Sequence, residues 1–259
     1  MRNELSAICH RLVTSSLRLV LLLGMVAAAV SSAAAARHAV TSTPSCRAGA
    51  LEHLGGDRRA YVAVAGQELA ARAAPWGRVV ARFGLLNQNA YPSLFSVRGR
   101  VVDARCRTAW YLVQLPLRPN GRVGYVAAWR VTVAPVTARI DVDLSARRLR
   151  LFTAGRLRLT TPAGIGAPDT PTPVGRFYVN QILLPPEPDG PFGPVAFGVS
   201  AFSPTLTDWP QGGPIAIHGT DDPTSIGAAD THGCVRISND AALTLRRLVP
   251  AGTPVVISR

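Results

Sequence analysis

Lysine is absent from this chain of 259 residues, so all 28 basic residues are arginine; they outnumber 15 acidic residues, and the formal net charge is +13. No nucleic-acid-binding motif and no interleaving of basic with aromatic residues is present, which argues against nucleic acid as the partner of this charge. No internal repeat is visible. With 47% apolar and 17% charged residues, the composition is that of a globular rather than a disordered protein. The length allows one or two domains.

Residues 1–36 predict a secretory signal peptide. Three arginines precede the apolar residues 19–30, and small residues follow over 31–36. This order is typical of an export signal, and the alanines allow cleavage near Ala35 or Ala36. An uncleaved anchor is the alternative, but the apolar run is shorter than the ~20 residues that a spanning helix needs. We therefore expect an exported protein, located in the periplasm or the cell wall.

Removing the leader also removes Arg2, Arg11, Arg18 and Glu4, which takes the net charge from +13 to +11. An arginine surplus outside the cell favours polyanionic surroundings, such as acidic cell-wall polymers or lipid headgroups. Export is a second argument against a nucleic-acid partner.

Cysteine usage fits the same compartment. Cys9 lies in the leader, and Cys46, Cys106 and Cys234 remain after it. An odd number in an exported protein suggests one disulfide and one free thiol. A Cys46–Cys106 pair would tie the N-terminal segment to the first domain and leave Cys234 free for chemistry.

Two segments precede the catalytic candidates. Residues 37–58 are predicted to be a linker with a short helix near residues 48–54. Residues 59–134 alternate short β-rich runs with turns, and Pro119-Asn120-Gly121 supplies the turn of a hairpin. Short strands at this spacing predict a small β-barrel. The predicted strands are 61–64, 79–83, 100–102, 111–115, 123–127 and 130–133.

Residues 59–134 resemble a bacterial SH3-like domain in Trp110, Leu115-Pro116 and Gly124-Tyr125-Val126. Such a domain would bind the cell wall through exposed aromatic residues, or serve as a spacer whose aromatic residues fill its own core. The two interpretations are equally open for Trp76, Tyr91 and Trp129.

Residues 136–259 form a second predicted domain, which begins after Pro135. Residues 139–144, 149–152 and 157–159 alternate apolar with polar side chains, as antiparallel strands with one buried face do. We expect further strands at 175–179 and 254–257, and a short helix that Ser238 caps and Pro250 ends. The class is therefore mainly β.

Residues 184–213 are rich in proline and glycine around an apolar run at 195–202. A loop of this length is usually functional, for example as a lid over a site. Its aromatic residues Phe197, Phe202 and Trp209 would line a cleft or pack in the core.

Residues 215–238 gather the chemistry. His218 and His232 are fourteen positions apart, and Cys234 follows two residues after His232. A thiol with a reference pKa of ~8.5 needs a neighbouring base to become a nucleophile, and histidine, with a reference pKa of ~6.5, suits that role. Gly233 permits a turn or a close approach of substrate next to Cys234. A satisfied core cysteine is the alternative.

The His-Gly-Thr triplet at 218–220 and the block Thr231-His-Gly-Cys-Val-Arg236 resemble the signature of the L,D-transpeptidase catalytic domain family. A second segment, Thr-Pro-Val-Gly-Arg-Phe at 172–177, resembles another recurrent stretch of that domain. The resemblance covers roughly residues 138–258. It implies a β-sandwich catalytic domain with a short C-terminal helix, no cofactor and no metal.

The resemblance implies the site roles residue by residue. Cys234 would be the nucleophile, His218 the base and His232 a positioning residue. Gly219, Thr231, Gly233 and Arg236 would bind substrate or form the oxyanion hole from backbone amides near residues 232–234. Arg236 could instead pair with an acidic neighbour. A backbone carbonyl near Gly219 could fix the tautomer of the base.

The implied activity is cross-linking of peptidoglycan stem peptides. A thioester between Cys234 and a tetrapeptide stem would form with release of D-alanine, and an amine of another stem would then accept the acyl group. Transfer to water would make the protein an L,D-carboxypeptidase, and transfer to a wall-anchored protein uses the same chemistry. A non-catalytic wall-binding protein is a further alternative. In another alternative, His218, His232 and Cys234 would bind zinc in a metallopeptidase. The sequence lacks the general base that an H-E-x-x-H motif supplies, which argues against it.

Overall fold

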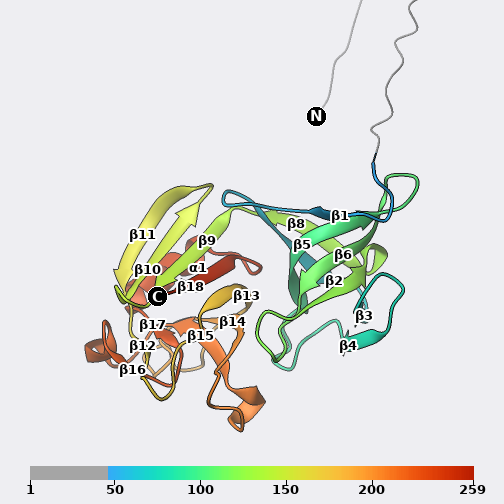
Figure 1. The fold of residues 1–259 in the computed structure, drawn as a ribbon. Coiled ribbons are helices and arrows are strands. Elements are labelled where there is room, and N and C mark those ends of the chain that lie inside the picture. Colours follow the sequence, from blue (N-terminus) through green and yellow to red (C-terminus); the bar gives the residue numbers. More distant parts are fainter. Residues whose placement is uncertain (1–45) are drawn as a thin grey trace, which may run out of the picture. The chain divides into compact units, whose positions relative to one another are not determined.

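The computed structural model describes residues 46–259, so the predicted leader and residues 37–45 of the predicted linker lie outside the described residues. The chain from residue 46 onward folds into two eight-stranded sheets and one two-stranded sheet (Figure 1). The helix α1 (Asn239–Leu248) is the only α-helix among residues 46–259. The predicted mainly β class is confirmed.

The first sheet has the strand order β4-β3-β7-β6-β5-β2-β8, with β1 added alongside β5. Its apolar residues form a core of their own, which includes Ala63, Phe95 and Val113. The resemblance to an SH3-like barrel stays a prediction. The strands are β1 (Leu51–His53), β2 (Ala60–Ala65), β3 (Leu69–Arg72), β4 (Val79–Phe83), β5 (Leu94–Val102), β6 (Thr108–Gln114), β7 (Val123–Ala127) and β8 (Val131–Val136).

The hairpin expected around Pro119-Asn120-Gly121 is confirmed, since β6 and β7 pair antiparallel from Trp110 opposite Ala127 to Gln114 opposite Val123. Gly121 has φ +83°, a left-handed conformation that glycine adopts without steric conflict.

The short helix expected near residues 48–54 is wrong, because Leu51–His53 forms the strand β1. This strand pairs antiparallel with β5, and Arg100 forms an ion pair with Glu52 at 2.8 Å. Pairing with an available strand outweighs the weak helix propensity of so short a segment. The described part of the predicted linker is therefore attached to the first sheet.

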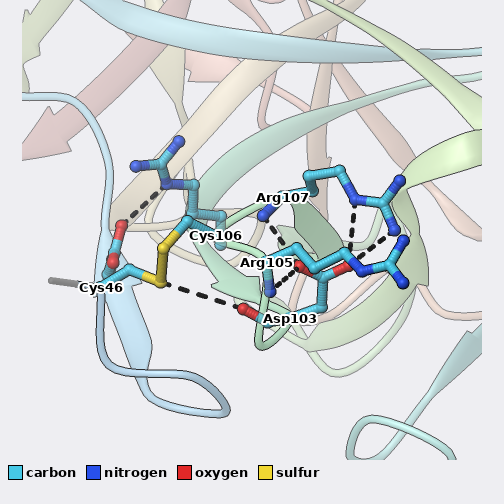
Figure 2. The surroundings of a disulfide bond; sticks show 7 residues. Cys46, Asp103, Arg105, Cys106 and Arg107 are labelled. Carbon is cyan, nitrogen blue, oxygen red and sulfur yellow. Dashed lines mark hydrogen bonds and ion pairs between the residues drawn. A yellow bond between two sulfur atoms is a disulfide. The ribbon is translucent and has the colours of Figure 1, made fainter. Parts of the chain in front are cut away.

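The predicted Cys46–Cys106 disulfide is confirmed, with 5.6 Å between the two Cα atoms and a sequence separation of 60. Figure 2 shows its surroundings, in which the Asp103 carboxylate accepts hydrogen bonds from the backbone N–H groups of Arg105 and Arg107. The disulfide joins the start of the described chain to the turn after β5.

The second sheet has the order β11-β10-β9-β18-β13-β14-β15-β17, and β12 pairs with β16 in a separate two-stranded sheet. Its members surround a core that includes Ile140, Leu149, Phe177 and Leu245. The strands are β9 (Ala138–Asp143), β10 (Arg148–Thr153), β11 (Arg156–Pro162), β12 (Ile165–Gly166), β13 (Gly175–Leu183), β14 (Ala196–Phe202), β15 (Pro214–His218), β16 (Ala229–Thr231), β17 (Val235–Arg236) and β18 (Pro254–Ser258).

The expected alternation holds on β9 and β10, where Ile140, Val142, Leu149 and Leu151 are buried. It fails on β11, an edge strand on which Leu157 is largely exposed. An edge strand packs against a neighbour on one side only, so its apolar residues need not reach the core.

The long loop expected over residues 184–213 is interrupted by a strand, because Ala196–Phe202 forms β14 between β13 and β15. Residues 196–201 are all buried, as expected for a continuous apolar run inside a sheet. Phe197 is fully buried and belongs to the core, not to a cleft. Loops remain only on either side of this strand.

The two sheets contact each other through Tyr178 on β13. Its buried hydroxyl donates to the carbonyl oxygens of Leu94 (3.1 Å) and Gln114 (3.3 Å) in the first sheet. The amide of Gln114 in turn donates to the Arg176 carbonyl at 2.9 Å. These buried bonds hold the first sheet against the domain that carries the candidate site.

Candidate active site

Two neighbouring parallel strands bring His218 and Cys234 together. In the β15–β17 pair, Ile217 lies opposite Val235 and His218 opposite Arg236. Continuing this register by one residue places Cys234 beside Ala216, and alternate residues of a strand project from the same face. The side chain of Cys234, the residue immediately before β17, is therefore expected on the same face of the sheet as His218, at the end of the adjacent strand.

The imidazole of His218 is buried and oriented by its own loop. Its Nδ1 lies 2.6 Å from the Gly219 carbonyl oxygen, which can only accept, so Nδ1 carries the proton and Nε2 the lone pair. This confirms the expectation that a backbone carbonyl near Gly219 orients the ring. The ring of Phe192 covers the imidazole, with 5.1 Å between centroids.

Burial lowers the pKa of His218, and the positive charge of Arg236 lowers it further, while the hydrogen bond to Gly219 opposes both. The neutral imidazole is therefore favoured, which is the form that can accept a proton.

Cys234 is the only free cysteine among residues 46–259, and it is half-buried. Burial raises the pKa of its thiol, while a hydrogen bond with the Ala216 backbone and the charge of Arg236 act in the opposite direction. Both shifts favour the uncharged forms, a protonated thiol and a neutral imidazole. Arg236 favours the thiolate once the proton leaves.

The turn before Cys234 is fixed by Thr231. Its buried hydroxyl donates to the Cys234 carbonyl at 2.6 Å and accepts the N–H of Gly233 at 3.1 Å. Gly233 has φ +109°, and a Cβ there would lie 2.9 Å from Cδ1 of Ile215. The conformation of this turn therefore favours glycine strongly.

Two threonines that the sequence did not single out hold the same turn from outside. Thr172 donates to the Gly233 carbonyl and Thr170 to the Thr231 carbonyl, both at 2.9 Å. A signal was available, because Thr172 opens the recurrent Thr-Pro-Val-Gly-Arg-Phe segment. Their hydroxyls explain why a segment about 60 residues before the cysteine belongs to the same motif set.

Asn239, another residue missed from the sequence, holds the loop after His218. Its Oδ1 accepts the N–H of Thr220 at 2.9 Å, and a Cβ on Gly219 would lie only 2.1 Å from this oxygen. Gly219 is therefore required by the packing of the first residue of α1 against the loop. Its carbonyl orients His218, and no side chain is available there to bind substrate.

Arg236 lies on β17 next to His218, and its Nε has no hydrogen-bond partner among residues 46–259. No ion pair of Arg236 occurs within that part of the chain. Asp222, an acidic residue four positions after His218, caps the short 3₁₀ helix Pro223–Ser225 through the N–H of Thr224 at 3.0 Å. Asp222 therefore shapes this turn.

The side chain of His232 is exposed, and its ring lies 5.2 Å from that of Trp209. Trp209 lies in the loop between β14 and β15, so one aromatic residue of the predicted cleft does reach the motif. Phe202 lies instead under the guanidinium of Arg118, 5.5 Å from its ring centroid.

No group of three or more His, Cys, Asp or Glu side chains is arranged to hold a metal ion within residues 46–259. His218, His232 and Cys234 therefore do not form the ligand cluster that the zinc hypothesis requires. No helix in that part of the chain is long and apolar enough to span a membrane.

A half-buried free cysteine and a buried, oriented histidine on adjacent strands of a mainly β domain define a cysteine enzyme of the acyl-transfer class. The model of the L,D-transpeptidase catalytic domain matches residues 137–257. The chain is 38% identical over 163 residues to L,D-transpeptidase YkuD of Bacillus subtilis, covering 61% of this chain and 90% of that protein. It belongs to the L,D-transpeptidase family, whose members are acyltransferases with a cysteine nucleophile.

A second relative is L,D-transpeptidase YkuD of Bacillus licheniformis, 36% identical over 151 residues that cover 56% of this chain and 84% of that protein. Among solved structures, an L,D-transpeptidase of Enterococcus faecium matches 47% of this chain and 49% of its own length, at 24% identity and a TM-score of 0.37.

Proposed function

We propose that this protein is exported and forms L,D cross-links in peptidoglycan through a thioester on Cys234. One observation carries the proposal: Cys234 and a buried, tautomer-fixed His218 project from the same face of adjacent strands. The neutral forms of both groups suit a proton transfer that accompanies attack, because the imidazole can take the thiol proton directly.

In the first half-reaction, Nε2 of His218 takes the thiol proton and the sulfur attacks the carbonyl carbon of the third residue of a tetrapeptide stem. The tetrahedral intermediate collapses, the amide C–N bond breaks, and the imidazolium returns its proton to the leaving D-alanine amine. An acyl group then remains on sulfur as a thioester.

In the second half-reaction, a side-chain amine of another stem attacks the thioester while His218 accepts its proton. The C–S bond breaks, the sulfur leaves as thiolate and takes up the proton from His218, and an L,D cross-link is formed. Water as acceptor would give a tripeptide, which is the L,D-carboxypeptidase alternative. An amine of a wall-anchored protein would use the same step.

The oxyanion of each tetrahedral intermediate would be bound by backbone amides near Cys234. The Gly233 N–H already donates to Thr231. We therefore assign the oxyanion hole to the backbone amides of Cys234 and His232, and give Gly233 the role of shaping the turn. Thr231 would act through that turn, without contact with substrate.

Arg236 would bind a carboxylate of the stem, because its Nε has no hydrogen-bond partner among residues 46–259. Its positive charge also lowers the pKa of both His218 and Cys234, which places it near the reacting groups. His232, on the exposed side next to Trp209, would position the stem at the entrance of the site.

The two sheets support the proposed division into a β domain at 59–134 and a catalytic domain at 136–259, since one apolar core lies within the first sheet and the other is centred on the second, where Val62 and Leu94 of the first sheet join it. The Cys46–Cys106 disulfide supports export, because such bonds persist in oxidising compartments.

The test is incubation of the purified protein with a disaccharide tetrapeptide, with products followed by mass spectrometry. A cross-linked dimer plus released D-alanine, absent for Cys234→Ala, is the expected result. His218→Gln should lower the rate by at least ~100-fold, as removal of a general base does. Tripeptide without dimer would favour the carboxypeptidase. If no product depends on Cys234, the interpretation as a non-catalytic wall-binding protein is favoured.

A second function of the β domain is favoured by the exposure of two tryptophans. Trp76 is 82% and Trp129 67% exposed, and both line a groove of about 770 Å³ over the buried ring of Trp110. Trp76 contacts Trp110 edge to face at 4.9 Å, and the Arg130 guanidinium lies 4.1 Å from the Trp129 ring. Tyr91, in contrast, packs against the core of the second sheet.

We propose that this groove binds the cell wall, since exposed aromatic rings held rigidly are suited to stacking on ligands. Co-sedimentation of the Cys234→Ala protein with purified sacculi tests it. Trp76→Ala and Trp129→Ala should each weaken binding several-fold, whereas Leu157→Ala, an exposed apolar residue outside the groove, should not. If all variants bind sacculi equally well, the groove is not the binding site and the interpretation of the domain as a spacer is favoured.

A further inference from the structure

The loop that joins β14 to β15 carries Trp209 to the edge of the candidate site. The Trp209 ring lies 5.2 Å from the His232 ring, two residues before Cys234, and the indole is still 48% exposed. Its free face is therefore available to a ligand that approaches the cysteine from this side.

The loop has little packing of its own. Residues 207–211 are all exposed, and Gln211, Gly212 and Gly213 follow one another with φ values of +59°, +79° and +66°. Only the hydrogen bond from the Ser203 N–H to the Gly213 carbonyl, 2.8 Å, closes its base directly. Segments with so few buried contacts open easily unless something else holds them.

The turn of the β6–β7 hairpin in the first sheet supplies that support. The Arg118 guanidinium donates to the carbonyl oxygens of Ser203 at 2.6 Å and Gly212 at 2.7 Å, one at each end of the loop. Hydrogen bonds from a charged donor are stronger than neutral ones. One side chain of the β domain therefore fixes both ends of the loop that carries Trp209.

Asn120 of the same turn holds the adjoining end of β14. Its amide nitrogen donates to the Phe202 carbonyl at 2.8 Å, and its Oδ1 accepts the Phe202 N–H at 2.9 Å. This pair of bonds imitates a neighbouring strand. A third contact joins the side chain of Gln211 to that of Asn89, in the loop between β4 and β5, at 3.1 Å.

We infer that Arg118 and Asn120 are positioning residues of the transpeptidase site, and that Trp209, which they hold in place, contacts the stem peptide. The inference rests on the proposed function for its substrate. It gives the β domain a direct part in catalysis, since the domain shapes one wall of the cleft through this loop.

Arg118→Ala and Trp209→Ala should each raise KM for the tetrapeptide stem by about tenfold and leave kcat within about twofold, because they remove binding and not chemistry. Alkylation of Cys234 by iodoacetamide, which is too small to need Trp209, should proceed at the wild-type rate. The double variant should be no worse than Trp209→Ala, because Arg118 acts only through that residue. Asn120→Ala should show the same effect in weaker form.

Arg122→Ala is the matched control, because Arg122 lies on the same turn and, within residues 46–259, its side chain donates only to the Arg118 carbonyl, at 3.4 Å. Its KM should stay at the wild-type value. Thermal unfolding of each variant separates a loosened loop from an unfolded protein.

Hydrogen–deuterium exchange of residues 203–213 tests whether Arg118 holds the loop, and it does so independently of catalytic activity. Exchange there should be at least several-fold faster in Arg118→Ala than in wild type and unchanged in Arg122→Ala. Unchanged exchange in Arg118→Ala, or additive losses in the double variant, would overturn the inference. If the wild-type protein gives no Cys234-dependent product but the loop exchanges faster in Arg118→Ala, the proposed function is overturned, while the role of Arg118 in holding the loop is retained.

Discussion

The hydroxyl of Thr231 donates to the carbonyl oxygen of Cys234 at 2.6 Å, so the first residue of the Thr-His-Gly-Cys block fixes the position of the last. The same hydroxyl accepts the N–H of Gly233. One buried oxygen thus closes the turn that presents the sulfur to His218.

Replacement of Thr231 by valine should lower the rate of acyl transfer at least tenfold. The change leaves a buried N–H and a buried carbonyl without the hydroxyl, which typically costs about 1–3 kcal/mol for each group. Steady-state kinetics on the tetrapeptide stem measure it, and Thr231→Ser, which keeps the hydroxyl, should retain most of the activity. Equal activity of the valine and serine variants would contradict this role.

Alkylation of Cys234 should become faster only at alkaline pH. Burial raises the pKa of the thiol, so the thiolate fraction stays low at neutrality and increases above the ordinary thiol range of ~8.5. The rate of modification by iodoacetamide as a function of pH reports this pKa. Arg236→Gln should move the profile to still higher pH, because it removes a charge that favours the thiolate. A rate that is already maximal near neutrality would indicate a thiolate–imidazolium pair instead.

Acidification should destabilise the fold through His218. Its pKa is lowered in the folded protein, so below ~6.5 the unfolded chain binds the proton first and the free energy of unfolding falls with pH. Above ~6.5 both states are neutral and the contribution is fully present. Urea unfolding of wild type and His218→Gln at several pH values isolates the effect, because the difference between them should shrink as pH falls. A constant difference would show that His218 does not titrate in this range.

Loss of the Cys46–Cys106 disulfide should lower the free energy of unfolding by about 2–4 kcal/mol, since it closes a loop of 60 residues. Urea unfolding of the Cys46→Ser/Cys106→Ser variant measures it. Turnover of the folded variant should stay near wild type, because the disulfide belongs to the first sheet and the candidate site to the second. An unchanged unfolding free energy would mean that β1 pairing alone holds the N-terminal segment.

The residues alone indicated the family and the mainly β class. They also placed α1 with its Ser238 cap, where the side chain accepts the Ala241 N–H at 3.3 Å. These features are local: a spaced His, Gly and Cys block, period-two alternation, a turn tripeptide and a cap are all written in neighbouring residues. The alternation on β9 and β10 held for the same reason.

Features that depend on residues distant in the chain became visible only in the tertiary structure. Leu51–His53 became a strand because β5 offered it hydrogen bonds, and residues 196–202 became a strand inside the second sheet because β13 and β15 flank them. The same holds for the supports of the site. Thr172 donates to the Gly233 carbonyl across 61 residues and Arg118 to the Ser203 carbonyl across 85, and no local pattern records a contact between residues so far apart in sequence.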